Sequence, residues 1–140
     1  MSQSQTPQTM IFVNLPVKDL DASKAFWTAL GYSFDDRFTD ETAACLVISD
    51  TIYAMLLTEA KFKEFTHKAV ADTATTAQTL LCLSAAGREA VDALVDTAVG
   101  AGGTEPRPAM DHGFMYMRGF EDLDGHTWEI MWMDPAATQG

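Results

Sequence analysis

The same order of strand-like and helix-like segments occurs twice along the chain, and this repeat constrains the fold more than any other feature. Residues 10–17 alternate between two faces as a strand does, and residues 18–31 follow with the pattern of a short helix. The second half repeats the order, with a strand at 79–84 before a helix at 87–103. The remaining expected elements are strands at 43–49, 51–58, within 106–122, and at 126–134. Sequence identity between the halves is low, so the repeat is one of element order.

The repeat predicts one domain of two modules, at residues 10–134. Module one covers about 10–60 and module two about 79–134, and a polar, partly helical linker at about 61–78 separates them. Residues 1–9 are polar and are expected to be a disordered tail. Residues 135–140 are expected to be a second tail.

The charge balance excludes some classes of partner. With 9 basic and 20 acidic residues the net charge is −11, which disfavours nucleic acid and anionic membranes. The negative charge suits a cationic ligand, or it simply keeps the protein soluble. No apolar run approaches the about 18–20 residues of a membrane helix, and the first residues do not resemble a secretory signal, so we expect a cytoplasmic protein. Cys45 and Cys82 lie in apolar segments, which predicts buried thiols.

A single carboxylate lies within the apolar last strand, in "EDLDGHTWEIMW" at residues 121–132. Strand alternation places Glu129 on one face with Thr127, Met131 and Met133, and places Trp128 and its neighbours on the other. Glu129 could serve as a metal ligand, a catalytic base or a ligand contact, or it could pair with a nearby residue or face water. A carboxylate in an apolar cavity would have a raised pKa unless it is paired, which suits a base or a cation contact.

Two segments resemble a known superfamily. "FVNLPVKDLDASKAFWTALGYSF" at 12–34 and "FEDLDGHTWEI" at 120–130 are similar to the vicinal oxygen chelate superfamily, which contains glyoxalases, bleomycin-resistance proteins and extradiol dioxygenases. The resemblance covers about residues 10–134 and is nearest to predicted lactoylglutathione lyase-like proteins. It implies an α+β fold of two βαβββ modules whose curled mixed sheets enclose a cavity, commonly as a homodimer. Neither motif reports which reaction is catalysed.

The resemblance also implies where metal ligands would lie. Counting from the motifs, the four positions fall on Phe12, on Leu80, on Met55 or Leu57, and on Glu129. Only Glu129 can bind a hard divalent ion, whereas a stable site needs three or four protein ligands. We therefore expect no metal ligands and no cofactor, and a divalent metal is disfavoured.

Other residues complete the candidate site. His112, at a turn before a strand, and Tyr116 are candidates to assist Glu129 in acid–base catalysis. The alternative is an exposed turn histidine and a half-buried tyrosine. By the family likeness, the faces of Glu129 and Phe12 line the cavity, so the expected ligand-binding residues are Phe12, Asn14, Met55 and Met131.

These residues support three hypotheses for the function. The first is a glyoxalase-like lyase or isomerase that acts on a small oxygenated substrate, with Glu129 as the base. The second is a metal-free protein of the bleomycin-resistance type that binds a small molecule. The third, an extradiol dioxygenase, is the weakest, because it needs two histidine ligands that the chain lacks at the expected positions.

Overall fold

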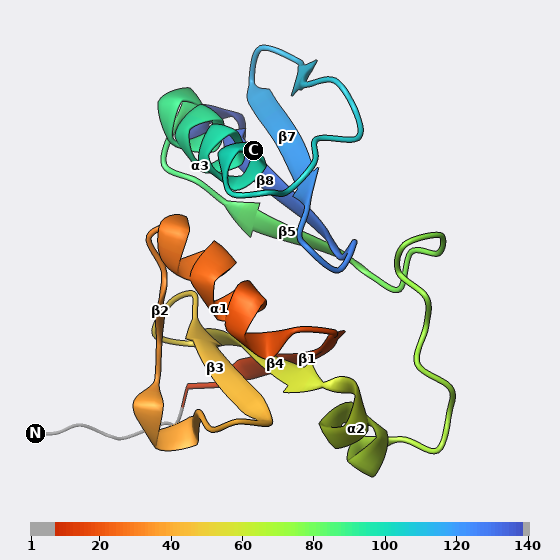
Figure 1. Cartoon of the computed structure of the whole chain (residues 1–140). Coiled ribbons are helices and arrows are strands. Elements are labelled where there is room, and N and C mark those ends of the chain that lie inside the picture. Colours follow the sequence, from red (N-terminus) through yellow and green to blue (C-terminus); the bar gives the residue numbers. More distant parts are fainter. Residues whose placement is uncertain (1–7, 139–140) are drawn as a thin grey trace, which may run out of the picture. The chain divides into compact units, whose positions relative to one another are not determined.

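The computed structural model describes residues 8–138, which form two compact units. Residues 8–27 and 31–70 make unit 1, and residues 28–30 and 71–138 make unit 2. Each unit contains a mixed four-stranded sheet and a main helix (Figure 1). The predicted α+β class with two modules is thereby confirmed. Residues 1–7 of the expected N-terminal tail lie outside the described residues.

Unit 1 contains the first sheet, in the order β1-β4-β3-β2. β1 and β4 are parallel, and the other neighbours are antiparallel. Its elements are β1 (Ile11–Val17), α1 (Leu20–Ala29), β2 (Ser33–Phe34), the 3-10 helix η1 (Asp36–Phe38), β3 (Ala43–Val47), β4 (Ile52–Thr58), α2 (Glu59–Phe62) and the 3-10 helix η2 (Lys63–Phe65). The two-residue strand β2 is too short to give a period-two signal, which explains why it was not predicted.

One face of the first sheet forms the core of unit 1. Strand alternation brings Leu15, Leu46 and Leu56 to the same face, and all three are fully buried. Helix α1 adds Phe26 and Trp27 to the buried set. The carboxylate of Asp19 accepts a hydrogen bond from the amide of Ala22, so the helix begins at a capped end, as its sequence predicts.

Unit 2 repeats this plan with the sheet order β5-β8-β7-β6. Its elements are β5 (Leu80–Ser84), α3 (Arg88–Gly100), β6 (Met110–Asp111), β7 (Met115–Glu121), β8 (Thr127–Met133) and the 3-10 helix η3 (Pro135–Thr138). β5 and β8 are parallel, and the other pairs are antiparallel. Residues 135–138 of the expected C-terminal tail form a short 3-10 turn, before which the Asp134 carboxylate accepts a hydrogen bond from the Ala136 amide, and residues 139–140 lie outside the described residues.

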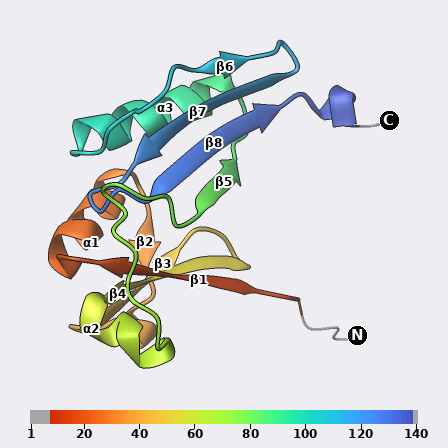
Figure 2. The same ribbon diagram turned by 90° about the vertical axis from the view of Figure 1, so that its right-hand side faces the viewer.

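The two faces of the second sheet have different surroundings. α3 lies along one face (Figure 2), where Phe120, Trp128 and Ile130 are buried together with Val91 and Val95 of the helix. The opposite face carries the half-buried or exposed side chains of β5, β7 and β8; we call it the open face of unit 2. The face alternation predicted for the last strand is therefore confirmed.

Cys82 corrects one prediction. Cys45 is buried as expected, but Cys82 is exposed. Cys82 lies on β5, which is an edge strand of the second sheet, and its side chain points to the open face, away from α3. An apolar sequence context does not by itself reveal which face of an edge strand is covered.

The "DLDG" motif builds the turn before β8. The Asp122 carboxylate accepts hydrogen bonds from the amides of Asp124 and His126 and from the indole N–H of Trp128, each at 3.0 Å. Gly125 has a φ of +84°, and a Cβ there would run into the carbonyl oxygen of Thr73. The motif is therefore structural: it closes the turn and orients Trp128 in the core, with Glu129 consequently on the open face.

Candidate functional site: a pocket on the open face of unit 2

A bulged segment lies along the outer edge of β7. Thr104 pairs with Glu121 at one end of the segment, and Met110 pairs with Met117 at the other. Between these pairs, the five residues 105–109 span only the three residues 118–120 of β7, so the segment cannot follow the strand and bulges away from it. We call residues 105–109, whose sequence is Glu-Pro-Arg-Pro-Ala, the edge bulge.

A pocket of about 250 Å³ lies beside the edge bulge. The bulge provides part of its wall, and strands β6, β7 and β8 provide the rest. Its lining residues are Pro106, Arg107, Pro108, Met110, Met117, Arg118, Gly119, Thr127 and Glu129. The volume is below the roughly 300–1,000 Å³ typical of sites for drug-sized ligands, so the pocket suits a smaller molecule.

Glu129 is the acidic residue of this pocket. Its register partners are Gly119 on β7 and Cys82 on β5. Within the described residues, no hydrogen bond or ion pair engages its carboxylate. Partial desolvation of the Cys82 thiol beside the sheet, and second the negative charge of the neighbouring Glu129, raise the pKa of Cys82. Because Gly119 has no side chain, the space beside Glu129 remains open to the pocket.

Arg107 is the basic residue whose guanidinium is available at this pocket. It is exposed, lies between two prolines at the crest of the edge bulge, and makes no hydrogen bond or ion pair within residues 8–138. The other three arginines of the chain each bind a carboxylate: Arg37 binds Asp35, Arg88 binds Asp111, and Arg118 binds several acids. In a chain with 20 acidic residues, an arginine without a partner beside a pocket is notable.

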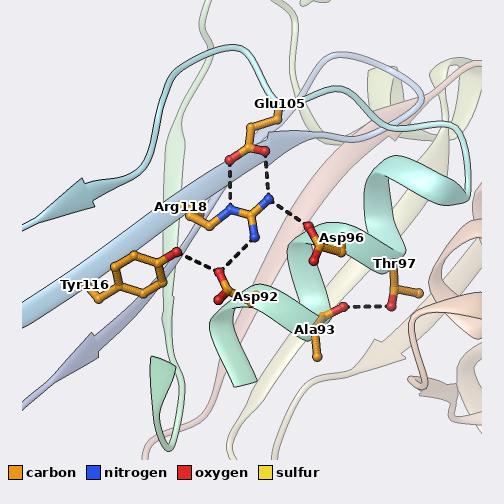
Figure 3. Close-up of polar contacts among 7 residues, drawn as sticks. All are labelled: Asp92, Ala93, Asp96, Thr97, Glu105, Tyr116 and Arg118. Atoms are coloured by element: carbon orange, nitrogen blue, oxygen red, sulfur yellow. Dashed lines mark hydrogen bonds and ion pairs between the residues drawn. The ribbon is translucent and has the colours of Figure 1, made fainter. Parts of the chain in front are cut away.

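Arg118 holds the edge bulge against the rest of unit 2 (Figure 3). Its guanidinium donates two hydrogen bonds to Glu105, at 2.9 and 2.8 Å, and one each to Asp92 and Asp96 of α3, both at 2.8 Å. The Glu105 hydrogen bonds raise the pKa of Arg118 more than the other contacts do. Arg118 also lines the pocket, but its guanidinium is occupied by these carboxylates. Its role at the pocket is therefore to position residues 105–109.

Tyr116 lies on the α3 side of the sheet and not beside Glu129. Its hydroxyl donates to the Asp92 carboxylate at 2.7 Å, and the hydrogen bond raises the pKa of Tyr116 and lowers that of Asp92 (Figure 3). In register, Tyr116 pairs with Trp132, whereas Glu129 pairs with Gly119, and adjacent residues of a strand point to opposite faces. The structure does not bring Tyr116 and Glu129 together.

His112 is also distant from Glu129. It is exposed in the turn between β6 and β7, where its ring stacks near Phe114 and its amide donates to the carbonyl of Met115. Met115 pairs with Met133, which lies four residues beyond Glu129 along β8, or about 13 Å at the usual rise of a strand. Tyr116 and His112, the two residues expected to assist Glu129, therefore both lie away from its carboxylate.

The expected ligand-binding residues divide between the two units. In unit 1, Asn14 and Met55 are register partners, and Phe12 shares their face and stacks on Tyr53 at 4.9 Å. In unit 2, Met131 lies two residues after Glu129 on β8 and therefore on the same open face, and it pairs with the pocket residue Met117. Sequence reasoning did not find Arg107, Met117 or the edge bulge. The available signal was the "PRP" sequence, in which two prolines prevent regular strand pairing around one arginine.

The residues at the metal positions of the superfamily do not fit a metal ion. Phe12 and Leu80 are exposed apolar side chains, and Met55 and Leu57 offer no oxygen or nitrogen. Across residues 8–138, no group of three or more His, Cys, Asp or Glu side chains is arranged to hold a metal. Glu129 and its neighbour Cys82 supply at most two donors, fewer than a structural or catalytic site requires.

Comparisons with known proteins show which family and which solved structures this chain is similar to. Residues 9–49 match the family model of the bleomycin resistance protein-like N-terminal domain. The hypothetical protein SA1046 from S. aureus is 25% identical, with a TM-score of 0.75 over 91% of this chain and 95% of that chain. A glyoxalase-related enzyme from Fulvimarina pelagi is 23% identical, with a TM-score of 0.75 over 90% of this chain and 88% of that one. A lactoylglutathione lyase from Agrobacterium tumefaciens is 14% identical, with a TM-score of 0.68 over 96% of this chain and 98% of that chain.

These matches define a protein with the glyoxalase/bleomycin-resistance/dioxygenase fold. The resemblance seen in the sequence is confirmed at the front of the chain by the family model, and the solved structures show that both units have the fold that it implies. No curated protein matches the sequence. None of the helices in the described part of the chain is long and apolar enough to cross a membrane.

Proposed function

We propose that the protein binds a small oxygenated molecule in the pocket of unit 2, with Glu129 as a principal polar contact. The observation that carries this proposal is the carboxylate of Glu129, which lines the pocket and has no polar partner among residues 8–138. A ligand that donates a hydrogen bond or carries a positive charge would provide the missing partner. Met110 and Met117 offer adaptable apolar walls for the rest of the ligand. The volume favours a ligand the size of a small metabolite.

A second candidate is a lyase or isomerase that uses the same carboxylate as a general base. Glu129 would take a proton from a hydroxyl-bearing carbon next to a carbonyl group, so that the C–H electron pair forms a carbon–carbon double bond and the carbonyl electron pair moves onto its oxygen, which takes up a proton. The proton held by Glu129 would then return to the former carbonyl carbon, as the neighbouring hydroxyl loses its proton and becomes the new carbonyl. This step needs no oxidant or reductant. The lactoylglutathione lyase with the same fold supports chemistry on a small oxygenated substrate. His112 and Tyr116 have no direct role in this proposal, and an extradiol dioxygenase is not proposed, because histidines are missing at the required positions.

Binding is tested by screening small oxygenated metabolites against isotope-labelled protein by NMR. A ligand of this pocket should shift the amide resonances of Met117, Gly119 and Thr127, and Glu129→Gln should weaken its binding about tenfold or more. Glu41→Gln, which removes one exposed carboxylate outside the pocket, is the matched control. If Glu129→Gln bound the same compounds as tightly as the wild type, the proposed site would be wrong.

Catalysis is tested on the bound compounds in deuterated water. A general base that exchanges its proton with solvent should introduce deuterium next to the oxygenated group, and Glu129→Gln should not. Binding without deuterium uptake would leave the small-molecule binding protein as the function and would contradict the lyase or isomerase.

We further propose that the protein needs no metal, and that it acts as a homodimer in the cytoplasm. The donor set at the superfamily's metal positions supports the first statement. Purified protein is expected to contain far less than one transition metal ion per chain by elemental analysis. A metal ion bound to the native state would raise the melting temperature, and its removal would lower it. Because we expect no bound metal, a chelator should leave the melting temperature unchanged. Stoichiometric zinc, nickel or iron would contradict this expectation.

A further inference from the structure

The pocket carries one unpaired basic residue as well as one unpaired acidic residue. Arg107 and Glu129 both line it, and neither has a hydrogen-bond or ion-pair partner within residues 8–138. They reach the pocket from different elements: Glu129 comes from β8 in the middle of the sheet, and Arg107 comes from the edge bulge. A ligand that satisfied Glu129 alone would leave the guanidinium of Arg107 without a counter-charge.

The edge bulge presents Arg107 in a restrained conformation. Glu105 is bound by two hydrogen bonds to Arg118, and Thr104 exchanges two backbone hydrogen bonds with Glu121, at 3.1 and 2.7 Å. Pro106 and Pro108 fix the backbone φ on both sides of Arg107. Restraint of this kind lowers the conformational entropy that binding would otherwise cost. The backbone that carries Arg107 is therefore restrained, although the Arg107 side chain is exposed.

The identity of the side chain points to an oxyanion. A guanidinium presents a planar fork of N–H donors that matches the two oxygens of a carboxylate, phosphonate or phosphate. The net charge of −11 would repel anions in general, so a local guanidinium is the feature that would let an acid bind here. Each of the other three arginines already has a carboxylate partner of the protein itself.

We propose that Arg107 is the anion-binding residue of the pocket, so that its ligand is a small organic acid that also carries an amino or hydroxyl group for Glu129. The acid group binds the guanidinium of Arg107, the amino or hydroxyl group donates to the carboxylate of Glu129, and the carbon chain between them contacts Met110 and Met117. This inference rests on the proposed function, since both use the pocket of unit 2. Beyond the proposed function, this inference states which charged groups the ligand carries.

The test uses ω-amino acids of increasing length, namely glycine, β-alanine, 4-aminobutyrate and 5-aminopentanoate, together with the ω-hydroxy acids of the same lengths, titrated into labelled protein and followed by NMR. At least one length should shift the amides of Met110, Met117 and Gly119. For that length, the matching acid without the amine and the matching amine without the acid should each bind more weakly. The phosphonate analogue of the same length separates a carboxylate site from a phosphonate or phosphate site.

Two variants make the assignment specific. Arg107→Gln should weaken the best amino acid about tenfold or more, equivalent to about 1.4 kcal/mol, and should leave the binding of the plain amine nearly unchanged. Arg37→Gln removes the same charge from an exposed arginine of unit 1 and should have no effect. Retention of the protein's amide spectrum shows that each variant is folded.

The outcomes separate this inference from the proposed function. If Arg107→Gln binds the amino acid as tightly as the wild type while Glu129→Gln loses the plain amine, the pocket stands and the anion assignment is wrong. If neither variant changes binding, or the shifted amides lie elsewhere, both proposals fail. If no probe of the series binds, the inference that the pocket takes an amino acid or hydroxy acid is overturned.

Discussion

Two glutamates of unit 2 have opposite surroundings. Glu129 has no polar partner in the described chain, whereas Glu105 accepts two hydrogen bonds from the guanidinium of Arg118. The same chemical change, Glu to Gln, should therefore have different consequences at the two positions. A carboxylate that is partly buried without a partner is costly to fold, and one that binds a guanidinium in two places is stabilising.

Glu129→Gln is expected to fold with a free energy of unfolding equal to or slightly above that of the wild type. Glu105→Gln is expected to lose about 1 kcal/mol, because an amide can accept only through one oxygen and the partly exposed pair is screened by solvent. Urea denaturation followed by tryptophan fluorescence measures both. A loss of several kcal/mol in Glu129→Gln would show that this residue is a structural partner and would remove the reason to assign it a function.

Asp111 gives a prediction about acid stability. The hydrogen bond from Arg88, helped by the amide of Gly113, lowers the pKa of Asp111 to about 2 in the folded protein. The unfolded value is near 3.9. Since the folded pKa is the lower one, this carboxylate contributes stability above about pH 4, and the contribution is lost as the pH falls toward 2.

Asp111→Asn should consequently have a lower melting temperature than the wild type at neutral pH, and the difference should disappear between pH 4 and pH 2. Thermal denaturation across this range checks the result. Asp50→Asn, at an exposed turn residue whose carboxylate makes no hydrogen bond or ion pair among residues 8–138, is the control and should not reproduce the loss seen in Asp111→Asn at neutral pH. A gap between wild type and Asp111→Asn that stays constant down to pH 2 would contradict the pairing with Arg88.

At the scale of elements, strand β7 makes room for the pocket by carrying a glycine. A Cβ on Gly119 would lie 3.2 Å from the carbonyl oxygen of Trp128 and 3.7 Å from Cγ of Glu129. The first contact is tight and requires a shift of a few tenths of an ångström, and the second fills the space in front of Glu129. Gly119→Ala should fold with a small loss of stability.

The same variant should bind ligands of the pocket more weakly than the wild type, because the new methyl group competes with them for space. Titration by NMR measures the effect, and Gly100→Ala at the end of α3, where a Cβ meets nothing within 4 Å, is the matched control. If Gly119→Ala bound ligands normally, the site would not extend to the middle of β7.

The contrast between β8 and the edge bulge shows what the sequence could predict. In β8, Trp128 and Ile130 alternate with Thr127 and Glu129, and this pattern alone places the carboxylate on the open face. The position of Arg107 depends on how residues 105–109 lie against β7, and the periodicity within each segment does not encode a register mismatch between the two. Tyr116 illustrates the same limit, since its face depends on the register of β7 with β8.

At the scale of the whole molecule, both sheets have exposed apolar side chains on an edge strand. Phe12 on β1 and Leu80 on β5 are 47% and 63% exposed. Exposed apolar residues on edge strands are a common site of association between chains, and two-fold dimers are the most frequent oligomers. This exposure supports the proposal of a homodimer.

The protein is expected to sediment as a dimer at micromolar concentration, and Leu80→Lys should shift the equilibrium toward the monomer. Phe65→Lys, at an exposed aromatic residue outside the sheets, is the control and should leave the dimer intact. Analytical ultracentrifugation measures both. A wild-type protein that sediments as a monomer would rule out the proposed assembly.

The edge bulge has a consequence for how proteins with this fold can diverge. Because hydrogen bonds to β7 fix both of its ends, residues can be inserted or removed between Thr104 and Met110 without altering the pairing of the sheet. Lengthening such a loop is inexpensive, at about 0.6 kcal/mol for each doubling. The size of the pocket can thus change without a large change in the stability of the fold. A change in the length of this segment alone could therefore adapt the pocket to a larger or smaller ligand during evolution.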